Sequence, residues 1–222
     1  MSGKNEGRLS RRAVLGAGIA AAGAVAGGLT ATPVHAKEPT LLYDRQDWGA
    51  RPPRGTIDII GPPTAIVVHH AVWPNTMDFS WERAALTSRE IQDLHMDDNG
   101  WKDAGQQLTI SRGGHVMEAR DRSFEAIRQG LNVMGAHVGG HNSYTIGIEN
   151  EGTYTDPDTV VPSGQFGSLA QTCAWLCERY GLDPHQAIAG HRDFNDTICP
   201  GEALYRRLPE LRDRTARLLA EW

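Results

Sequence analysis

Two histidines and one cysteine are the side chains of this sequence that could bind a metal ion together: His69, His191 and Cys199. Imidazole nitrogen and cysteine sulfur are ligands that zinc prefers, and a catalytic zinc site uses three protein ligands in a tetrahedron whose fourth position is left to water. Because the chain holds nine histidines, the eight-residue spacing from His191 to Cys199 is a weak signal taken alone. This spacing indicates a metal site only if the fold brings the three side chains together at the ends of strands.

The segments around these residues predict strands that could position them. Residues 64–70 are rich in β-branched and apolar side chains, which is typical of a buried strand, and they end in two histidines. Adjacent side chains of a strand point to opposite faces. His69 and His70 therefore could not readily bind one ion, and His70 is interpreted as a packed or hydrogen-bonded residue. A further strand is predicted over residues 144–149, and a weaker one over residues 186–189.

The remaining elements predict a mixed α/β fold. Thr87 and Glu90 have the spacing of a capping box, which predicts a helix that starts there and closes at Asn99-Gly100. Residues 166–180 have helical periodicity and stop at Gly181. Two strands joined by a glycine-rich turn and a C-terminal helix are expected at residues 108–111, 115–119 and 204–222. We therefore expect an α/β single domain, in which about three helices pack a central mixed β-sheet with the candidate metal ligands at the strand ends.

The first 36 residues have the pattern of an export signal. Arg11-Arg12 precede an uncharged stretch rich in Ala and Gly, and Val34-His35-Ala36 matches an A-x-A-like cleavage site. Paired arginines before a weakly apolar stretch resemble a twin-arginine signal. The alternative is a permanent membrane anchor, but the stretch is shorter and less apolar than the about 20 residues that span a bilayer. We expect a signal peptide over residues 1–36, a single folded domain over residues 37–222, a secreted or cell-wall location and no stable membrane insertion after cleavage.

The charge and the cysteine content narrow the class of partner. Without residues 1–36 the chain keeps 18 basic and 26 acidic side chains, a net charge of −8, which argues against nucleic-acid binding. The remaining 186 residues suffice for one domain with its own core, and a monomer is expected. Cys173 and Cys177 share an apolar helical face and are interpreted as buried small side chains, with a reactive or paired role as the alternative. Cys199 is the cysteine that remains for chemistry.

Several short motifs occur together in order along the chain. They are Arg45-x-x-Trp48-Gly49-Ala50-Arg51, Val67-Val68-His69-His70-Ala71, Trp101-Lys102-Asp103-Ala104-Gly105, Gly135-Ala136-His137, Ile146-Gly147-Ile148-Glu149, Gly190-His191-Arg192-Asp193 and Thr197-Ile198-Cys199-Pro200-Gly201. The set resembles the peptidoglycan-recognition and phage-lysozyme-type family of N-acetylmuramoyl-L-alanine amidases, also called amidase type 2. The resemblance covers nearly all of residues 41–205.

The resemblance implies a zinc enzyme that acts on peptidoglycan. The first strand histidine of the family falls on His69, its loop histidine on His191 and its cysteine on Cys199. The implied reaction is hydrolysis of the amide between N-acetylmuramic acid and the L-alanine of the stem peptide, with Zn2+ as cofactor and peptidoglycan as partner. Zinc lowers the pKa of bound water to about 7 and polarises a carbonyl, and amide hydrolysis needs both.

Two residues are expected to be catalytic in such an enzyme. Glu149 is the expected general base, because a carboxylate that closes an apolar strand beside a metal has little structural reason to be there. The alternatives are a solvated carboxylate at a strand end and Glu151 as the base. Thr197 matches a position where relatives place a donor near the scissile carbonyl, and its alternative is an ordinary turn residue.

Three further residues are expected to bind substrate. His137 matches the Gly-x-His step of the family, whose ring faces the substrate cleft, with a structural histidine as the alternative. Asn142 corresponds to an asparagine that lines the same cleft. Trp73 is expected to flank the groove where a sugar or peptide would lie, and the alternative is an aromatic side chain at the rim without a ligand.

The sequence departs from the family pattern at two places. Gln106 stands where many of these enzymes carry a catalytic tyrosine, and Ala71 stands where a threonine usually follows the histidine pair. The cysteine pair of the animal recognition proteins near the first helix is also missing. These features favour the bacterial secreted branch. The related branch that trims anhydromuropeptides uses a glutamate after the Ile-Gly-Ile strand in place of the tyrosine, so Glu149 is expected to replace that function here.

Two other functions compete with the amidase. One is a non-catalytic peptidoglycan-binding module, but recognition proteins that only bind commonly lack the cysteine, so Cys199 favours the enzyme. The other is a zinc enzyme for a different amide or peptide, which would keep the ligands and change the cleft.

Overall fold

The strands predicted beside the candidate metal ligands are neighbours in one sheet. The computed structural model describes residues 37–222, and the predicted signal peptide lies outside the described residues. A six-stranded sheet has the order β1-β5-β4-β7-β3-β8. Its strands are β1 (Leu42–Tyr43), β3 (Ala65–His70), β4 (Leu108–Ile110), β5 (Val116–Glu118), β7 (Thr145–Asn150) and β8 (Ile188–Gly190). β4 and β5 are antiparallel, and the other neighbours in this sheet are parallel. A second, antiparallel pair joins β2 (Ile59–Ile60) and β6 (Asn132–Val133).

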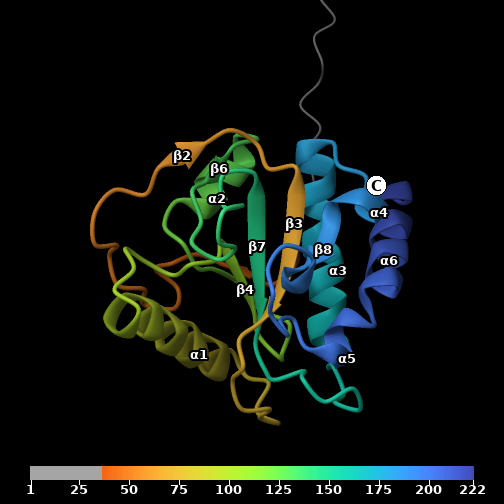
Figure 1. Cartoon of the computed structure of the whole chain (residues 1–222), viewed down its shortest axis with the longest axis horizontal. Coiled ribbons are helices and arrows are strands. Elements are labelled where there is room, and N and C mark those ends of the chain that lie inside the picture. Colours follow the sequence, from red (N-terminus) through yellow and green to blue (C-terminus); the bar gives the residue numbers. More distant parts are fainter. Residues whose placement is uncertain (1–36) are drawn as a thin grey trace, which may run out of the picture. The chain divides into compact units, whose positions relative to one another are not determined.

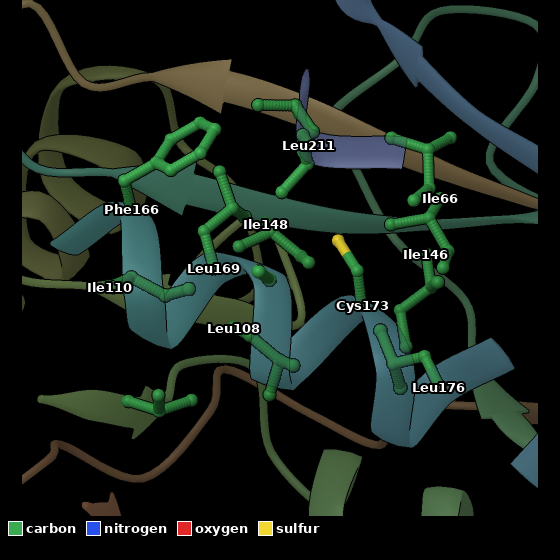
Figure 2. Close-up of a cluster of buried hydrophobic side chains, with 14 of the residues drawn as sticks. Ile66, Leu108, Ile110, Ile146, Ile148, Phe166, Leu169, Cys173, Leu176 and Leu211 are labelled. Carbon is green, nitrogen blue, oxygen red and sulfur yellow. The ribbon is translucent and has the colours of Figure 1, made fainter. Parts of the chain in front are cut away.

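One face of the six-stranded sheet is buried under helix α3 (Ser163–Tyr180), and α6 (Leu208–Ala220) lies beside α3 (Figure 1). Alternate side chains of the central strands point into this core and meet one face of α3 (Figure 2). They include Ile66, Ile146, Ile148, Leu108 and Ile110 from the strands, Phe166, Leu169, Cys173 and Leu176 from α3, and Leu211 from α6. Burying an aliphatic or aromatic side chain contributes about 1.5–3 kcal/mol. Because a slip by one residue would turn all these side chains to the other face, the core holds the strands in register.

The predicted α/β class and most of the predicted elements are confirmed. The strands expected over residues 64–70, 108–111, 115–119 and 144–149 are β3, β4, β5 and β7, and the helix that stops at Gly181 is α3. The buried state of Cys173 and Cys177 is confirmed as well, and both are free thiols. The C-terminal helical run consists of two helices, α5 (Glu202–Tyr205) and α6.

The strand predicted over residues 186–189 begins two residues later, at Ile188. Residues 186 and 187 instead belong to the short helix α4 (Pro184–Ala187). The Asp183 side chain accepts the backbone N–H of His185 and caps this helix, and proline is well suited to its first position.

Helix α1 (Trp81–Asp93) begins earlier than predicted, and the capping box was wrong. The N-cap is Ser80, whose hydroxyl accepts the backbone N–H three residues on at 3.2 Å. Thr87 instead donates its hydroxyl to Glu151 Oε1 at 3.0 Å. The carboxylate of Glu90 accepts the indole N–H of Trp73 at 2.8 Å. Both side chains therefore make tertiary contacts in the middle of a helix.

Helix α1 packs near one edge of the sheet, on the face opposite α3. Ala84 and Ala85 contact Met117 of β5 together with Trp48. Met117 pairs with Thr109 of β4, so the α1 contact and the Thr109 side chain share one face of the sheet.

The elements that the sequence did not reveal are short. They are β1, β2, β6, α2 (Ser123–Arg128), α4 and the 3₁₀ helix η2 (His191–Asp193). The π-helix η1 (Leu94–Asp98) continues α1 to the predicted close at Asn99. Two to six residues are too few for a periodic pattern to stand out. Within residues 37–222, none of the helices is long and apolar enough to cross a membrane.

Candidate metal centre

Neighbouring strands place three polar side chains in one row. Thr109 of β4 pairs with Glu149 of β7, and Glu149 pairs with His69 of β3. Paired residues of parallel strands point to the same face, so these side chains lie on the face opposite the α3 core. On the far side of β3, Val68 pairs with the last residue of β8, and His191 follows directly. The ends of these strands thus bring residues from distant segments to one place.

The three predicted metal ligands lie together. One ligand atom each from His69, His191 and Cys199 lies within 4.8 Å of the other two. Cys199 Sγ is 3.6 Å from His69 Nδ1. A tetrahedral zinc ion with bonds of about 2.3 Å to sulfur and about 2.1 Å to nitrogen separates these two atoms by about 3.6 Å. The cluster therefore has the donor atoms that zinc prefers, and its Cys199–His69 pair has the spacing of two zinc ligands.

The surroundings of the cluster favour neutral ligand side chains. Burial lowers the pKa of His69 well below its usual value, and the neighbouring rings of His137 and His191 lower it further. Burial also lowers the pKa of His191. For the Cys199 thiol, burial raises the pKa to about 12, and the nearby Glu149 carboxylate adds to the shift. Neutral imidazole is the form that binds metal, whereas this thiol needs a bound cation to lose its proton near neutral pH.

His70 points away from the cluster, and its interpretation as a packed residue is confirmed. Its ring is 4% exposed, and its Nδ1 accepts the backbone N–H of Tyr154 at 3.1 Å. Burial lowers the pKa of His70 to about 4, which keeps the ring neutral and able to accept this hydrogen bond.

The two candidate bases, Glu149 and Glu151, have different surroundings. Glu149 lies in register with His69, and burial raises the pKa of its carboxyl group to about 7. Glu151 is 1% exposed and accepts hydrogen bonds from the Thr87 hydroxyl at 3.0 Å and from the backbone N–H of Arg112 at 2.8 Å. Its carboxylate therefore ties α1 to the turn after β4, whereas Glu149 lies beside His69 and is close enough to Cys199 to raise the pKa of its thiol.

The loop after β6 places His137 against the metal cluster. His137 Nδ1 lies 3.0 Å from His69 Nε2. A Cβ atom on Gly147 would lie 2.6 Å from the His137 ring, so the glycine of the Ile-Gly-Ile strand makes room for this ring on the sheet. The Asn142 side chain accepts the backbone N–H groups of His137 and Val138 at 2.8 and 3.0 Å. His137 thus contacts the candidate ligand His69, and Asn142 holds the backbone of the loop that carries His137. Their predicted contact with substrate stays a prediction.

Thr197 and Trp73 lie at two small hollows. The Thr197 hydroxyl accepts the backbone N–H of Cys199 at 3.2 Å, and Thr197 lines a hollow of about 330 Å³ with Arg192 and Ile198. Trp73 lines a hollow of about 400 Å³ together with acidic residues of α1 and η1. A hollow of about 810 Å³ is bordered by residues 44–53 and 118–129, which include none of the predicted site residues. The chemistry of the side chains, rather than the size of a hollow, therefore marks the candidate site.

Two residues near the site were not singled out as functional from the sequence. Asn195 Oδ1 lies 3.2 Å from His191 Nε2, four residues away along the loop. Gln106 is 1% exposed, and its side-chain amide donates to the Thr109 hydroxyl at 2.9 Å. Among the described residues, Gln106 Oε1 has no hydrogen-bond partner. For Asn195, the available signal in the sequence was its position four residues after His191. For Gln106, the signal was the departure from the family pattern.

Comparison with known proteins agrees with this geometry. Residues 60–202 match the family model described as N-acetylmuramoyl-L-alanine amidase. The chain is 30% identical over 168 residues to peptidoglycan-recognition protein LB of Drosophila melanogaster, covering 75% of this chain and 67% of that protein. It is 32% identical over 167 residues to an N-acetylmuramoyl-L-alanine amidase of Homo sapiens, covering 74% of this chain but 27% of the human protein.

Solved structures show the same fold. The structure of wild-type Drosophila PGRP-LB superposes with a TM-score of 0.64 at 28% identity, over 75% of this chain and 91% of that one. The endolysin amidase LysCS from Clostridium intestinale superposes with a TM-score of 0.61 over 79% of this chain and 96% of that one, and at 21% identity this likeness concerns the fold alone. With a family model that matches 143 of its residues, this chain belongs to the N-acetylmuramoyl-L-alanine amidase family.

Proposed function

We propose that the protein is a zinc-dependent amidase that hydrolyses the bond between N-acetylmuramic acid and L-alanine in peptidoglycan. The observation that carries the proposal is the pairing of His69 with Glu149 on adjacent strands, next to His191 and Cys199. A structural zinc site is closed by four protein ligands, whereas a catalytic one has three. The cluster found among residues 37–222 offers three ligands and a carboxyl group beside them.

The residues of this site supply the proton transfers. A zinc ion bound by the three ligands would activate water and polarise the scissile carbonyl. Glu149 takes a proton from the attacking water and delivers it to the nitrogen of the departing L-alanine, because its carboxyl group lies beside His69 on the same face of the sheet and can both accept and return a proton. The C–N bond breaks, which leaves a carboxylate on the N-acetylmuramic acid and an amine on the peptide. Thr197 accepts the Cys199 N–H, so its own O–H is free to donate to the carbonyl oxygen.

Peptidoglycan fragments are the substrate class that the relatives support. A mutant of Drosophila PGRP-LB, at 28% identity to this chain, has been solved in complex with tracheal cytotoxin. Peptidoglycan recognition protein LE, which shares the fold, has been solved with the same molecule, a monomeric diaminopimelic acid-type peptidoglycan. By analogy, we expect the lactyl amide of a muropeptide to bind beside Glu149 and His69.

Mass spectrometry of digested cell wall tests the proposed reaction. The purified protein, loaded with zinc, should release peptides with a free N-terminal L-alanine from purified peptidoglycan and leave the glycan strands uncut. Removal of zinc by a chelator should stop the release, and added zinc should restore it. Binding to the wall without release of peptides would instead identify a recognition module, and cleavage at another amide would identify a different hydrolase.

We also propose that residues 1–36 direct export by the twin-arginine route and are then removed, which would place the monomeric enzyme at the cell wall. The support is the pattern of Arg11-Arg12, the weakly apolar stretch and the site at Ala36. A variant with Arg11→Lys and Arg12→Lys should accumulate uncleaved inside the cell, as shown by immunoblotting of cell fractions. Normal secretion of that variant would indicate the general route for unfolded chains.

A further inference from the structure

One loop, residues 137–142, lies against both histidines of the metal centre. On one side, His137 Nδ1 is 3.0 Å from Nε2 of His69. On the other side, Asn195 connects the loop to the second histidine. The Asn195 side-chain amide donates to the carbonyl oxygen of Gly139 at 3.2 Å, and its Oδ1 lies 3.2 Å from His191 Nε2. Both imidazole rings are therefore linked to the same loop by side-chain hydrogen bonds.

The hydrogen-bonding chemistry assigns the proton on the His191 ring. A carbonyl oxygen can only accept, so the Asn195 group facing Gly139 must be its NH₂. The Asn195 oxygen then faces His191 and accepts the proton of Nε2. A neutral imidazole with its proton on Nε2 has a free lone pair on Nδ1, which is the atom left for a metal.

The first histidine is oriented in the same way. The Thr145 hydroxyl donates to the carbonyl oxygen of His141 at 2.9 Å, so its oxygen is an acceptor for His137 Nε2 at 3.4 Å. His137 Nδ1 is then the acceptor for a proton on His69 Nε2. This leaves His69 Nδ1 unprotonated, and that atom lies 3.6 Å from Cys199 Sγ.

We propose that Asn195 is a positioning residue for zinc binding, which orients the His191 ring by accepting its Nε2 proton, while the bond to Gly139 holds the Asn195 amide with its oxygen towards that ring. The proposal rests on the proposed function in so far as zinc is the metal. The loop is a firm support, because the Asn142 side chain accepts two of its backbone N–H groups. Without the Asn195 side chain, His191 lies on a partly exposed loop and its ring can rotate away from the geometry that the ion needs. Partners of this kind typically change metal affinity about 10–100-fold.

The local backbone does not depend on this side chain. The backbone N–H of Asn195 donates to the carbonyl oxygen of His191 at 3.2 Å, and that of Phe194 donates to the same oxygen at 3.0 Å. Replacing Asn195 by alanine keeps both bonds and removes only the side-chain link. Replacing it by aspartate keeps an acceptor for His191 and removes the donor to Gly139.

Competition of the purified full chain with a zinc-chelating dye tests the proposal. Asn195→Ala should bind zinc about 10–100-fold more weakly than wild type, whereas Asn195→Asp should stay within about threefold of wild type. Asp196→Ala, a change at the neighbouring position, is the matched control and should bind like wild type. The absorption bands of the Co²⁺-loaded protein should change in Asn195→Ala, because the geometry at the metal changes. The metal-free melting temperature of this variant should stay within about 2 °C of wild type.

The outcomes separate the two proposals. Wild-type affinity in Asn195→Ala, or equal losses in Asn195→Ala and Asn195→Asp, would overturn the role of Asn195 and leave the zinc amidase untouched. A wild-type protein that binds zinc tightly but releases no peptide would overturn the proposed reaction, while the affinities of the variants would still decide the role of Asn195. A wild-type protein that fails to bind zinc would overturn both.

Discussion

The candidate metal centre consists of two halves that the fold holds in different ways. His69 and Glu149 belong to adjacent strands, and their positions are fixed by backbone hydrogen bonds and by the core on the other face of the sheet. His191 and Cys199 lie beyond the last strand, in partly exposed chain. The loop half is held by a few local bonds, such as the backbone N–H of Arg192 to the carbonyl oxygen of Cys199 at 2.9 Å.

The difference separates the stability of the fold from the chemistry of the site. Changes in the loop half should remove metal and activity at little cost to stability, because few buried contacts depend on it. In the strand half, a change of Glu149 that keeps the shape of the side chain should leave the metal in place, because Glu149 is not one of the three ligands. The following experiments test this division.

The largest effect is expected for Cys199→Ser. A serine oxygen is a much weaker zinc ligand than a thiolate, so the variant should lose most of its zinc and essentially all hydrolysis. Elemental analysis of the purified variant measures the zinc, and the metal-free melting temperature should resemble that of the metal-free wild type. Full zinc occupancy in Cys199→Ser would remove Cys199 from the ligand set.

A loss of rate without loss of metal is expected for Glu149→Gln. Removal of a general base typically lowers the rate by about 10²–10⁴-fold. The amide keeps the size of the side chain, so zinc content and binding to peptidoglycan should be unchanged. Near wild-type cleavage by this variant, with zinc retained, would show that another group is the base.

The matched control for this change is Glu151→Gln, two residues along the chain. Its carboxylate accepts bonds from Thr87 and the Arg112 N–H, so the variant should lower the melting temperature and keep the rate of each folded molecule. A loss of rate in Glu151→Gln as large as in Glu149→Gln would contradict the assignment of the base.

A smaller effect is expected on the stability of the metal-free protein. Burial raises the pKa of Glu149 from 4.5 to about 7, so the folded state binds this proton more tightly than the unfolded chain. The stability of wild type should therefore fall as the pH rises from 4.5 towards 7, relative to Glu149→Gln. Above pH 7 the variant should be more stable by about 1–3 kcal/mol, and below pH 4.5 the difference should vanish. Urea unfolding at several pH values measures this, and a constant difference would show that Glu149 does not carry the shift.

The sequence predicted the strand half of the site well, because its signals are local. A run of β-branched residues marks β3, and the two-residue period of a strand separates His69 from His70. The loop half has no such period. The eight-residue spacing from His191 to Cys199 does not predict the path of the loop between them. The family motifs, rather than any periodicity, predicted that these two residues lie beside His69.

Contacts between distant segments were the part that the sequence could not show. The Thr87 hydroxyl donates to Glu151, 64 residues away, and does not cap a helix. The Thr87–Glu90 spacing fits a capping box but lies inside helix α1. The Asn195 amide reaches Gly139, 56 residues away, and only the folded chain shows that the two loops meet. Local propensity is a weak guide wherever a polar side chain can satisfy a buried tertiary partner instead.

The smallest effect on rate is expected for Gln106→Ala, at the position where relatives carry a tyrosine. Gln106 adjoins the strand half, because its amide donates to Thr109, which pairs with Glu149. An amide has no proton affinity near neutral pH, so the rate should fall by less than about threefold. Loss of a buried side chain should still lower stability, by about 1–2 kcal/mol. Peptide release per folded molecule and urea unfolding measure the two effects. An unchanged rate in Gln106→Ala would show that Glu149 acts as the base without help from Gln106. A loss as large as that of Glu149→Gln would mean that proton transfer depends on Gln106, Thr109 and Glu149 together, and that the strand half works as one unit.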